Sequence, residues 1–110
     1  MDQYMKPVME MFAGFADVPR DFDAVARFIT SAGARFEVGG HAESGPILYE
    51  AQVTAVIGHA YGTDEYIATA ISYDSPLNCL IKACTNLAQG EPTRFDRRID
   101  QITTLGKDAP

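Results

Sequence analysis

An unbroken run of alternating side chains from Ile47 to Ile57 constrains the fold of this chain more than any other segment. Every second residue is apolar or small, and these would lie on one face: Ile47, Tyr49, Ala51, Val53, Ala55 and Ile57. The other face would carry Leu48, Glu50, Gln52, Thr54 and Val56. A period of two predicts a β-strand with one buried face. Such a strand needs neighbouring strands for its backbone hydrogen bonds and a layer that covers its apolar face.

Two further strands and two helices are predicted around this run. Residues 34–38 alternate in the same way, and residues 65–73 are rich in Tyr, Ile and Thr, which favour strands. Residues 21–33 and 74–90 carry apolar side chains at helical spacing, and each stretch opens with residues that can cap a helix. The order over residues 21–90 is therefore α-β-β-β-α. It predicts a single α+β domain in which helices pack on a three-stranded antiparallel sheet.

Both ends of the chain extend beyond this core. Residues 1–20 contain all four methionines and an apolar stripe at helical spacing made by Met5, Val8, Met9 and Phe12. We expect a Met-rich helical arm that either packs on the core or forms an interface, because methionine adapts to contact surfaces. In residues 91–110, the spacing of Phe95, Ile99 and Ile102 predicts a third, shorter helix followed by a tail.

Charge is distributed unevenly along the chain. The formal net charge is −6, and no Lys or Arg occurs between Arg35 and Lys82. That interval contains the carboxylates Glu37, Glu43, Glu50, Asp64, Glu65 and Asp74. Proteins that bind nucleic acid neutralise phosphates with clustered Lys and Arg, so this pattern argues against direct nucleic-acid binding. It fits either a surface that keeps the protein soluble or one that binds a basic partner.

The sequence has no recognisable catalytic or metal-binding motif. His41 and His59 flank the long predicted strand, which would place them too far apart to share an ion. Cys79 and Cys84 point in different directions on a predicted helix, which suits neither a disulfide nor a zinc site. We therefore expect no enzyme activity, no cofactor and no metal. No apolar run is long enough to span a membrane, so we expect a cytoplasmic protein.

The order of elements over residues 21–90 resembles that of the phage ABA-sandwich family, a group of small phage proteins. In that family a capped amphipathic helix leads into a strand, a hairpin follows, and the last helix opens with a Pro-Leu pair. The matching residues here are the helix 21–33, the strand with Phe36, and the stretch Asp74-Ser75-Pro76-Leu77-Asn78-Cys79-Leu80-Ile81-Lys82-Ala83-Cys84. The resemblance implies a phage or mobile-element origin and a place in the cytoplasm of a bacterial host cell. It assigns no functional residues.

These observations lead to three functional hypotheses. The first is a non-enzymatic phage accessory protein that binds and inhibits a host protein with a basic surface, as an anti-CRISPR protein does. Its contacts would be the carboxylates Glu50, Asp64, Glu65 and Asp74 and the aromatic anchors Tyr61 and Tyr66. The second is a nucleotide-sequestering or other small-molecule binder, with a pocket lined by Tyr61, Tyr66 or His59. The third is a structural or self-assembling phage protein, and a homodimer fits several of these roles.

Overall fold

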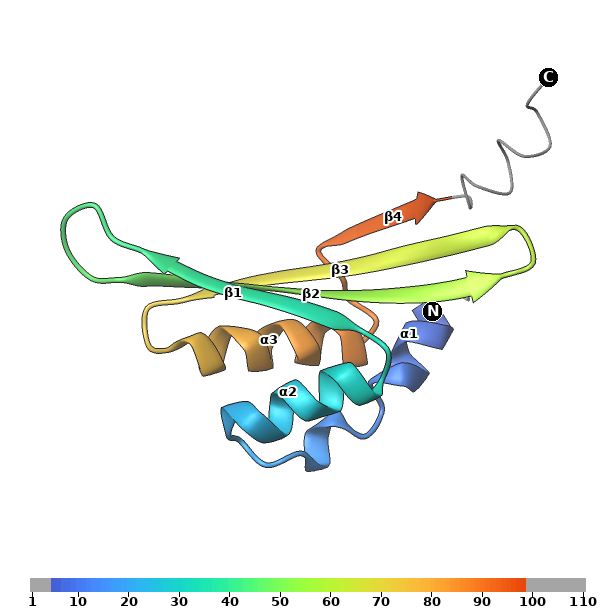
Figure 1. Ribbon diagram of the computed structural model, residues 1–110, viewed down its shortest axis with the longest axis horizontal. Coiled ribbons are helices and arrows are strands. Elements are labelled where there is room, and N and C mark those ends of the chain that lie inside the picture. The colour runs from blue at the N-terminus through green and yellow to red at the C-terminus, as the bar shows by residue number, and fades with distance from the viewer. Residues whose placement is uncertain (1–4, 99–110) are drawn as a thin grey trace, which may run out of the picture.

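The computed structural model describes residues 5–98, in which helices cover one face of a four-stranded sheet (Figure 1). In chain order the elements are α1 (Lys6–Met11), the 3₁₀ helix η2 (Phe15–Asp17), α2 (Phe22–Ser31), β1 (Arg35–His41), β2 (Leu48–His59), β3 (Gly62–Ser72), α3 (Pro76–Ala88) and β4 (Arg94–Arg98). The strands lie in the order β1-β2-β3-β4, and all neighbours are antiparallel. The expected α+β order, with α3 packed on the sheet, is confirmed.

The sheet has an inner face, which the helices cover, and an outer face, on which no helix lies among the described residues (Figure 1). The alternation predicted for β2 sets these faces: Ala51, Val53 and Ala55 are fully buried on the inner side. Glu50 and the even-numbered residues of β2 lie on the outer side. Because paired residues share a face, Gly39 of β1 and Ile71 of β3, which both lie opposite Glu50, are also on the outer face.

Two predicted caps begin the longer helices. The Asp21 side chain accepts a hydrogen bond of 2.9 Å from the Ala24 N–H, and Ser75 Oγ accepts one of 3.0 Å from the Asn78 N–H. Each cap satisfies a backbone donor that a helix N-terminus leaves unpaired. Beyond these caps, the apolar side chains of both helices, such as Val25 on α2, pack in the core cluster with residues of the inner face.

The N-terminal segment is part of the core. Val8 and Phe12 are 0 % exposed, and Phe15 is 2 % exposed. They pack with residues of α2, α3 and the inner face in one cluster. Of the two roles left open for this segment, core packing describes residues 5–15, while residues 1–4 lie outside the described chain.

The prediction of a short helix after Pro92 is wrong for the part of the chain that can be compared. Residues Arg94–Arg98 form β4, which pairs with Thr63–Ile67 of β3 and extends the sheet to four strands. The free edge of β3 offers backbone hydrogen bonds that this segment takes up, and such tertiary pairing overrides local periodicity. Ile99, Ile102 and the expected tail lie outside the described residues.

Candidate functional site

The outer face is covered in one part by its own side chains. Arg35 of β1 lies opposite Thr54, and Glu65 of β3 lies opposite Val56. The Arg35 guanidinium nevertheless reaches the Glu65 carboxylate at 3.2 Å, so the ion pair crosses over β2. Thr54 is 2 % exposed and its neighbour Ile67 is 4 % exposed, although no helix formed by residues 5–98 lies on this face. We call this region, with Arg35, Thr54, Glu65 and Ile67, the closed half.

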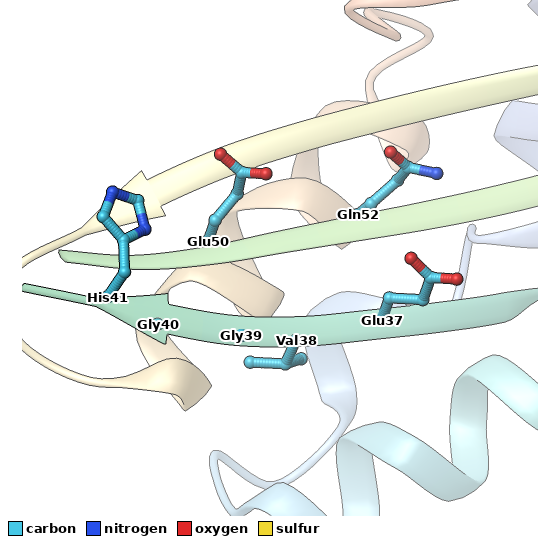
Figure 2. A pocket seen from close by; sticks show the side chains of 7 residues that line it. All are labelled: Glu37, Val38, Gly39, Gly40, His41, Glu50 and Gln52. Carbon is cyan, nitrogen blue, oxygen red and sulfur yellow. The ribbon is translucent and has the colours of Figure 1, made fainter.

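The other part of the outer face is open and acidic. Glu37, His41, Glu50 and Gln52 line a hollow of about 310 Å³ at the end of the sheet near the β1–β2 connection. Figure 2 shows the side chains of these four residues on the same side of β1 and β2, whereas Val38 points the opposite way. We call these four residues, with Ile71 on β3, the acidic half.

Two consecutive glycines lie in β1 beside the hollow. Gly39 lies opposite Glu50 on the outer face, and a Cβ placed on it would meet nothing within 4 Å. A strand residue without a side chain leaves bare backbone, which allows another group to approach closely. Gly40 has a different role, because a Cβ there would lie only 3.0 Å from the Tyr49 ring. Gly39 therefore provides the floor of the hollow, and Gly40 makes room for packing.

Glu37 and Glu50 give the acidic half its negative charge. None of the ion pairs within the described residues involves Glu37 or Glu50. Of the nearest cations in the sequence, Arg35 pairs with Glu65, while Lys82 Nζ donates at 3.4 Å to the backbone carbonyl of Ile71, the residue opposite Glu50. The two carboxylates lie on adjacent strands above a bare glycine, an arrangement that attracts a cation.

Apolar surface adjoins these carboxylates. Ile71 lies opposite Glu50 and is 54 % exposed, and Tyr73, two residues further along the chain, is 63 % exposed. Interfaces combine apolar and aromatic contact area with polar groups that fix orientation. The acidic half with Tyr73 beside it offers both kinds of contact within one end of the sheet.

The four carboxylates expected to bind a partner do not form one patch. Glu50 lies in the acidic half, and Asp74 is exposed just beyond β3, where Asn78 Nδ2 donates to its carboxylate at 3.1 Å. Asp64 and Glu65 lie near the other end of β3. Glu65 is opposite Val56, six residues from Glu50 along β2, which corresponds to about 20 Å. A single side chain bound in the hollow can therefore contact Glu50 but not Glu65.

The two expected aromatic anchors differ completely in exposure. Tyr61 is 80 % exposed in the turn between β2 and β3, where it is available for contact. Tyr66 is 1 % exposed, because its register opposite Ala55 directs it to the inner face. Tyr66 is therefore part of the core, and its assignment as a surface anchor is wrong.

His59 and Asp64 stabilise the turn between β2 and β3. The Tyr61 N–H donates to His59 Nδ1 at 3.1 Å, which assigns the ring proton to Nε2, 3.4 Å from Asp64 Oδ1. Asp64 itself is 7 % exposed. Each ring nitrogen of His59 therefore has a partner within the turn. The hollow is lined by neither His59 nor Tyr61.

The two thiols belong to the core. Cys79 and Cys84 are both 0 % exposed, and Cys79 Sγ donates to the Pro76 carbonyl at 3.1 Å. Burial raises the pKa of Cys84 to about 12 and also raises the pKa of Cys79. A protonated, buried thiol is a poor nucleophile. Within residues 5–98, no three side chains of His, Cys, Asp or Glu are grouped so that they could hold a metal ion.

Sequence reasoning missed several members of the acidic half, namely Glu37, His41, Gln52 and Ile71. The available signal was the alternation itself, which places Gln52 beside Glu50, together with the two glycines that directly follow the predicted strand 34–38.

Across the described residues, no helix is both long and apolar enough to cross a bilayer. Comparison of the sequence with protein-family models finds no match, and neither curated proteins nor solved structures provide a similar protein.

Proposed function

We propose that this protein is a non-enzymatic binding protein whose acidic half holds a basic surface of another protein. The observation that carries the proposal is the hollow between Glu37 and Glu50, two carboxylates that take part in no ion pair among the described residues, with a bare glycine floor and the exposed Ile71 beside it on β3. The resemblance to small phage proteins suggests that the partner is a bacterial host protein. Occupation of its basic surface would block whatever that surface normally binds, as anti-CRISPR proteins do.

The chemistry of the hollow favours a cationic partner over a nucleotide. A nucleotide carries phosphates, and Glu37 and Glu50 would repel them at close range. A Lys or Arg side chain gains charge-assisted hydrogen bonds from the same carboxylates. Charge complementarity of this kind speeds association and selects among partners.

The proposal is tested with a charge-neutral variant of the acidic half. Glu37→Gln with Glu50→Gln keeps the shape of both side chains and removes two charges. We expect affinity for the captured partner to fall about tenfold or more, because the loss of about 1.5 kcal/mol, the low end of the coupling measured for close interfacial charge pairs, corresponds to about tenfold. Pull-down from a bacterial lysate and titration of the purified partner at low and raised salt give the measurement.

A matched control separates local charge from net charge. Glu10→Gln with Asp17→Asn removes the same number of charges from exposed positions on α1 and η2. The partner should bind this control as it binds the wild type. Equal weakening by both variants, or unchanged binding by the first, would mean that the acidic half is not the binding surface.

A further inference from the structure

We infer that the basic partner binds as an extended segment that pairs with the free edge of β1 and adds a fifth strand to the sheet. This inference rests on the proposed function and specifies how the acidic half is recognised. Within the described residues, β1 is the first strand of the sheet and pairs only with β2 (Figure 1). An unpaired edge offers a row of backbone donors and acceptors to another chain.

The hydrogen bonds of β3 establish which backbone groups of β1 point outward. Thr93, the residue before β4, lies on the β4 side of β3. Its Oγ1 accepts a hydrogen bond of 2.9 Å from the Thr69 N–H and donates one of 3.1 Å to the Ile67 carbonyl. The odd-numbered residues of β3 therefore face β4, and its even-numbered residues face β2. Along each strand the backbone groups point alternately to one side and the other. Two directly opposed residues of an antiparallel pair either both point toward each other or both point away.

The same alternation passes through the sheet to β1. Val53 lies opposite Ala68, so the odd-numbered residues of β2 bond to β3 and its even-numbered residues bond to β1. Glu50 lies opposite Gly39. The backbone groups of Gly39, and of Glu37 two residues earlier, therefore form their hydrogen bonds with β2. The N–H and C=O groups of Phe36, Val38 and Gly40 consequently point outward from the edge of the sheet, where an added strand can form hydrogen bonds with them.

An added strand would place alternate side chains above the acidic half. Residues of the added strand opposite Glu37 and Gly39 would lie on the outer face. They would form non-hydrogen-bonded pairs, in which the two Cα atoms are only about 4.5 Å apart. A basic side chain opposite Glu37 meets its carboxylate directly. One opposite Gly39 extends over the bare glycine toward Glu50 on the next strand, about 4.8 Å further across the sheet. The missing side chain at Gly39 gives this cation its path.

The other side of the added strand would meet apolar surface. Phe36 is on the inner face of β1, and its ring lies 6.0 Å from the ring of Phe22 at the start of α2. Phe22 is 43 % exposed, so apolar surface continues from β1 onto the helix. The segment that fits this edge alternates basic and apolar residues.

Charge selects this occupant over a second copy of the chain. Two copies paired through β1 would bring two acidic halves together, and each chain has a formal net charge of −6. Like charges at short range oppose such pairing. A basic segment instead neutralises Glu37 and Glu50 as it binds.

The test uses a nine-residue peptide in which arginine alternates with valine, and a control peptide in which glutamate replaces arginine. Amide hydrogen exchange is followed by NMR on the full chain. We expect the arginine peptide to slow exchange at Phe36, Val38 and Gly40 at least tenfold. Exchange at Glu37 and Gly39, which are already bonded to β2, should be nearly unchanged. The glutamate peptide should leave all five amides unaffected.

A variant at the floor of the hollow provides a second readout. Gly39→Val fills space that is empty in the wild type and leaves the edge groups of β1 in place. We expect the arginine peptide to bind at least fivefold more weakly to this variant, with the same alternating protection at saturation. Thermal unfolding of the variant shows whether it remains folded, and the wild-type exchange pattern decides the inference without it.

The possible failures are distinguishable. Binding that requires Glu37 and Glu50 but gives no alternating protection overturns the fifth-strand inference and leaves the proposed function intact. Binding that ignores both carboxylates overturns both. Alternating protection in the peptide-free protein, with light scattering that reports a dimer, overturns the inference in favour of a second copy.

Discussion

Ile67 and Ile71 show how differently the two halves of the outer face are built. The two side chains belong to the same strand and the same face, yet Ile67 is 4 % exposed and Ile71 is 54 % exposed. Ile67 lies between Thr54 of β2 and Arg94 of β4, beside the Arg35–Glu65 ion pair. β4 does not extend to Ile71, and the residue across from it on β1 is Gly39.

The difference shows that a sheet face can be closed without a helix. In the closed half, a fourth strand and a charged pair that crosses β2 remove apolar groups from water. In the acidic half, the same strands carry a glycine and two carboxylates, and the apolar surface stays accessible. Exposed apolar surface beside unneutralised charge is typical of an interaction site.

The comparison of the closed half with the acidic half predicts that Ile67→Ala has the largest effect on stability. Removal of a nearly buried isoleucine side chain should lower the free energy of unfolding by about 2–5 kcal/mol. The same change at Ile71 should alter it by less than about 1 kcal/mol, because that side chain is already half exposed. Urea unfolding of both variants gives the two values. Similar losses at the two positions would show that the halves do not differ in packing.

Alkaline pH tests the core beneath both halves. The ordinary pKa of the Cys84 thiol is 9.0, and burial raises it to about 12 in the folded protein. Between these values the unfolded chain has lost the proton and the folded chain keeps it. The contribution of Cys84 to stability is therefore complete below pH 9 and falls by about 1.4 kcal/mol per pH unit above it.

The contribution of Cys84 is isolated by the Cys84→Ala variant. Other groups titrate in the same range, so the measured quantity is the difference in unfolding free energy between wild type and variant from pH 8 to pH 11. That difference should be flat below pH 9 and should shrink above it. A difference that stays constant throughout would mean that the thiol is less buried than described.

The smallest effect is expected for the ion pair of the closed half. The Arg35 side chain is 67 % exposed, so solvent screens its interaction with Glu65. A double-mutant cycle with Arg35→Met and Glu65→Gln should give a coupling energy below about 1 kcal/mol, reduced further by salt. A coupling of several kcal/mol would show that the pair itself, rather than the strands around it, closes this half.

Most of the fold follows from local sequence signals. The alternation within residues 47–57 and the caps at Asp21 and Ser75 depend on near neighbours, and the structure confirms them except at Ile47, which precedes β2 and is 48 % exposed. β4 was not predictable in this way, because Arg94–Arg98 has no apolar alternation and becomes a strand only against β3. The spacing of Phe95 and the residues after it indicated a helix instead.

The candidate site was less predictable because it depends on register. The sequence placed Glu50 on the polar side of its strand, which is confirmed, but it could not place Gly39 opposite it or show that Arg35 reaches Glu65. Tyr66 was misassigned for the same reason, since only pairing with Ala55 reveals its face. Composition identified the acidic character of this region, and strand pairing placed Glu37 and Glu50 on the same face of adjacent strands.

The free edge of β1 also has a consequence for handling the protein. An unpaired strand can act as a template on which identical chains stack into fibres. Mutual repulsion between chains opposes this, and it weakens as the pH approaches the isoelectric point of about 4.7. Glu37 and Glu50 would thus protect stored, concentrated protein from ordered aggregation as well as select its partner. A variant without them should be kept dilute, well above that pH, and checked with an amyloid dye.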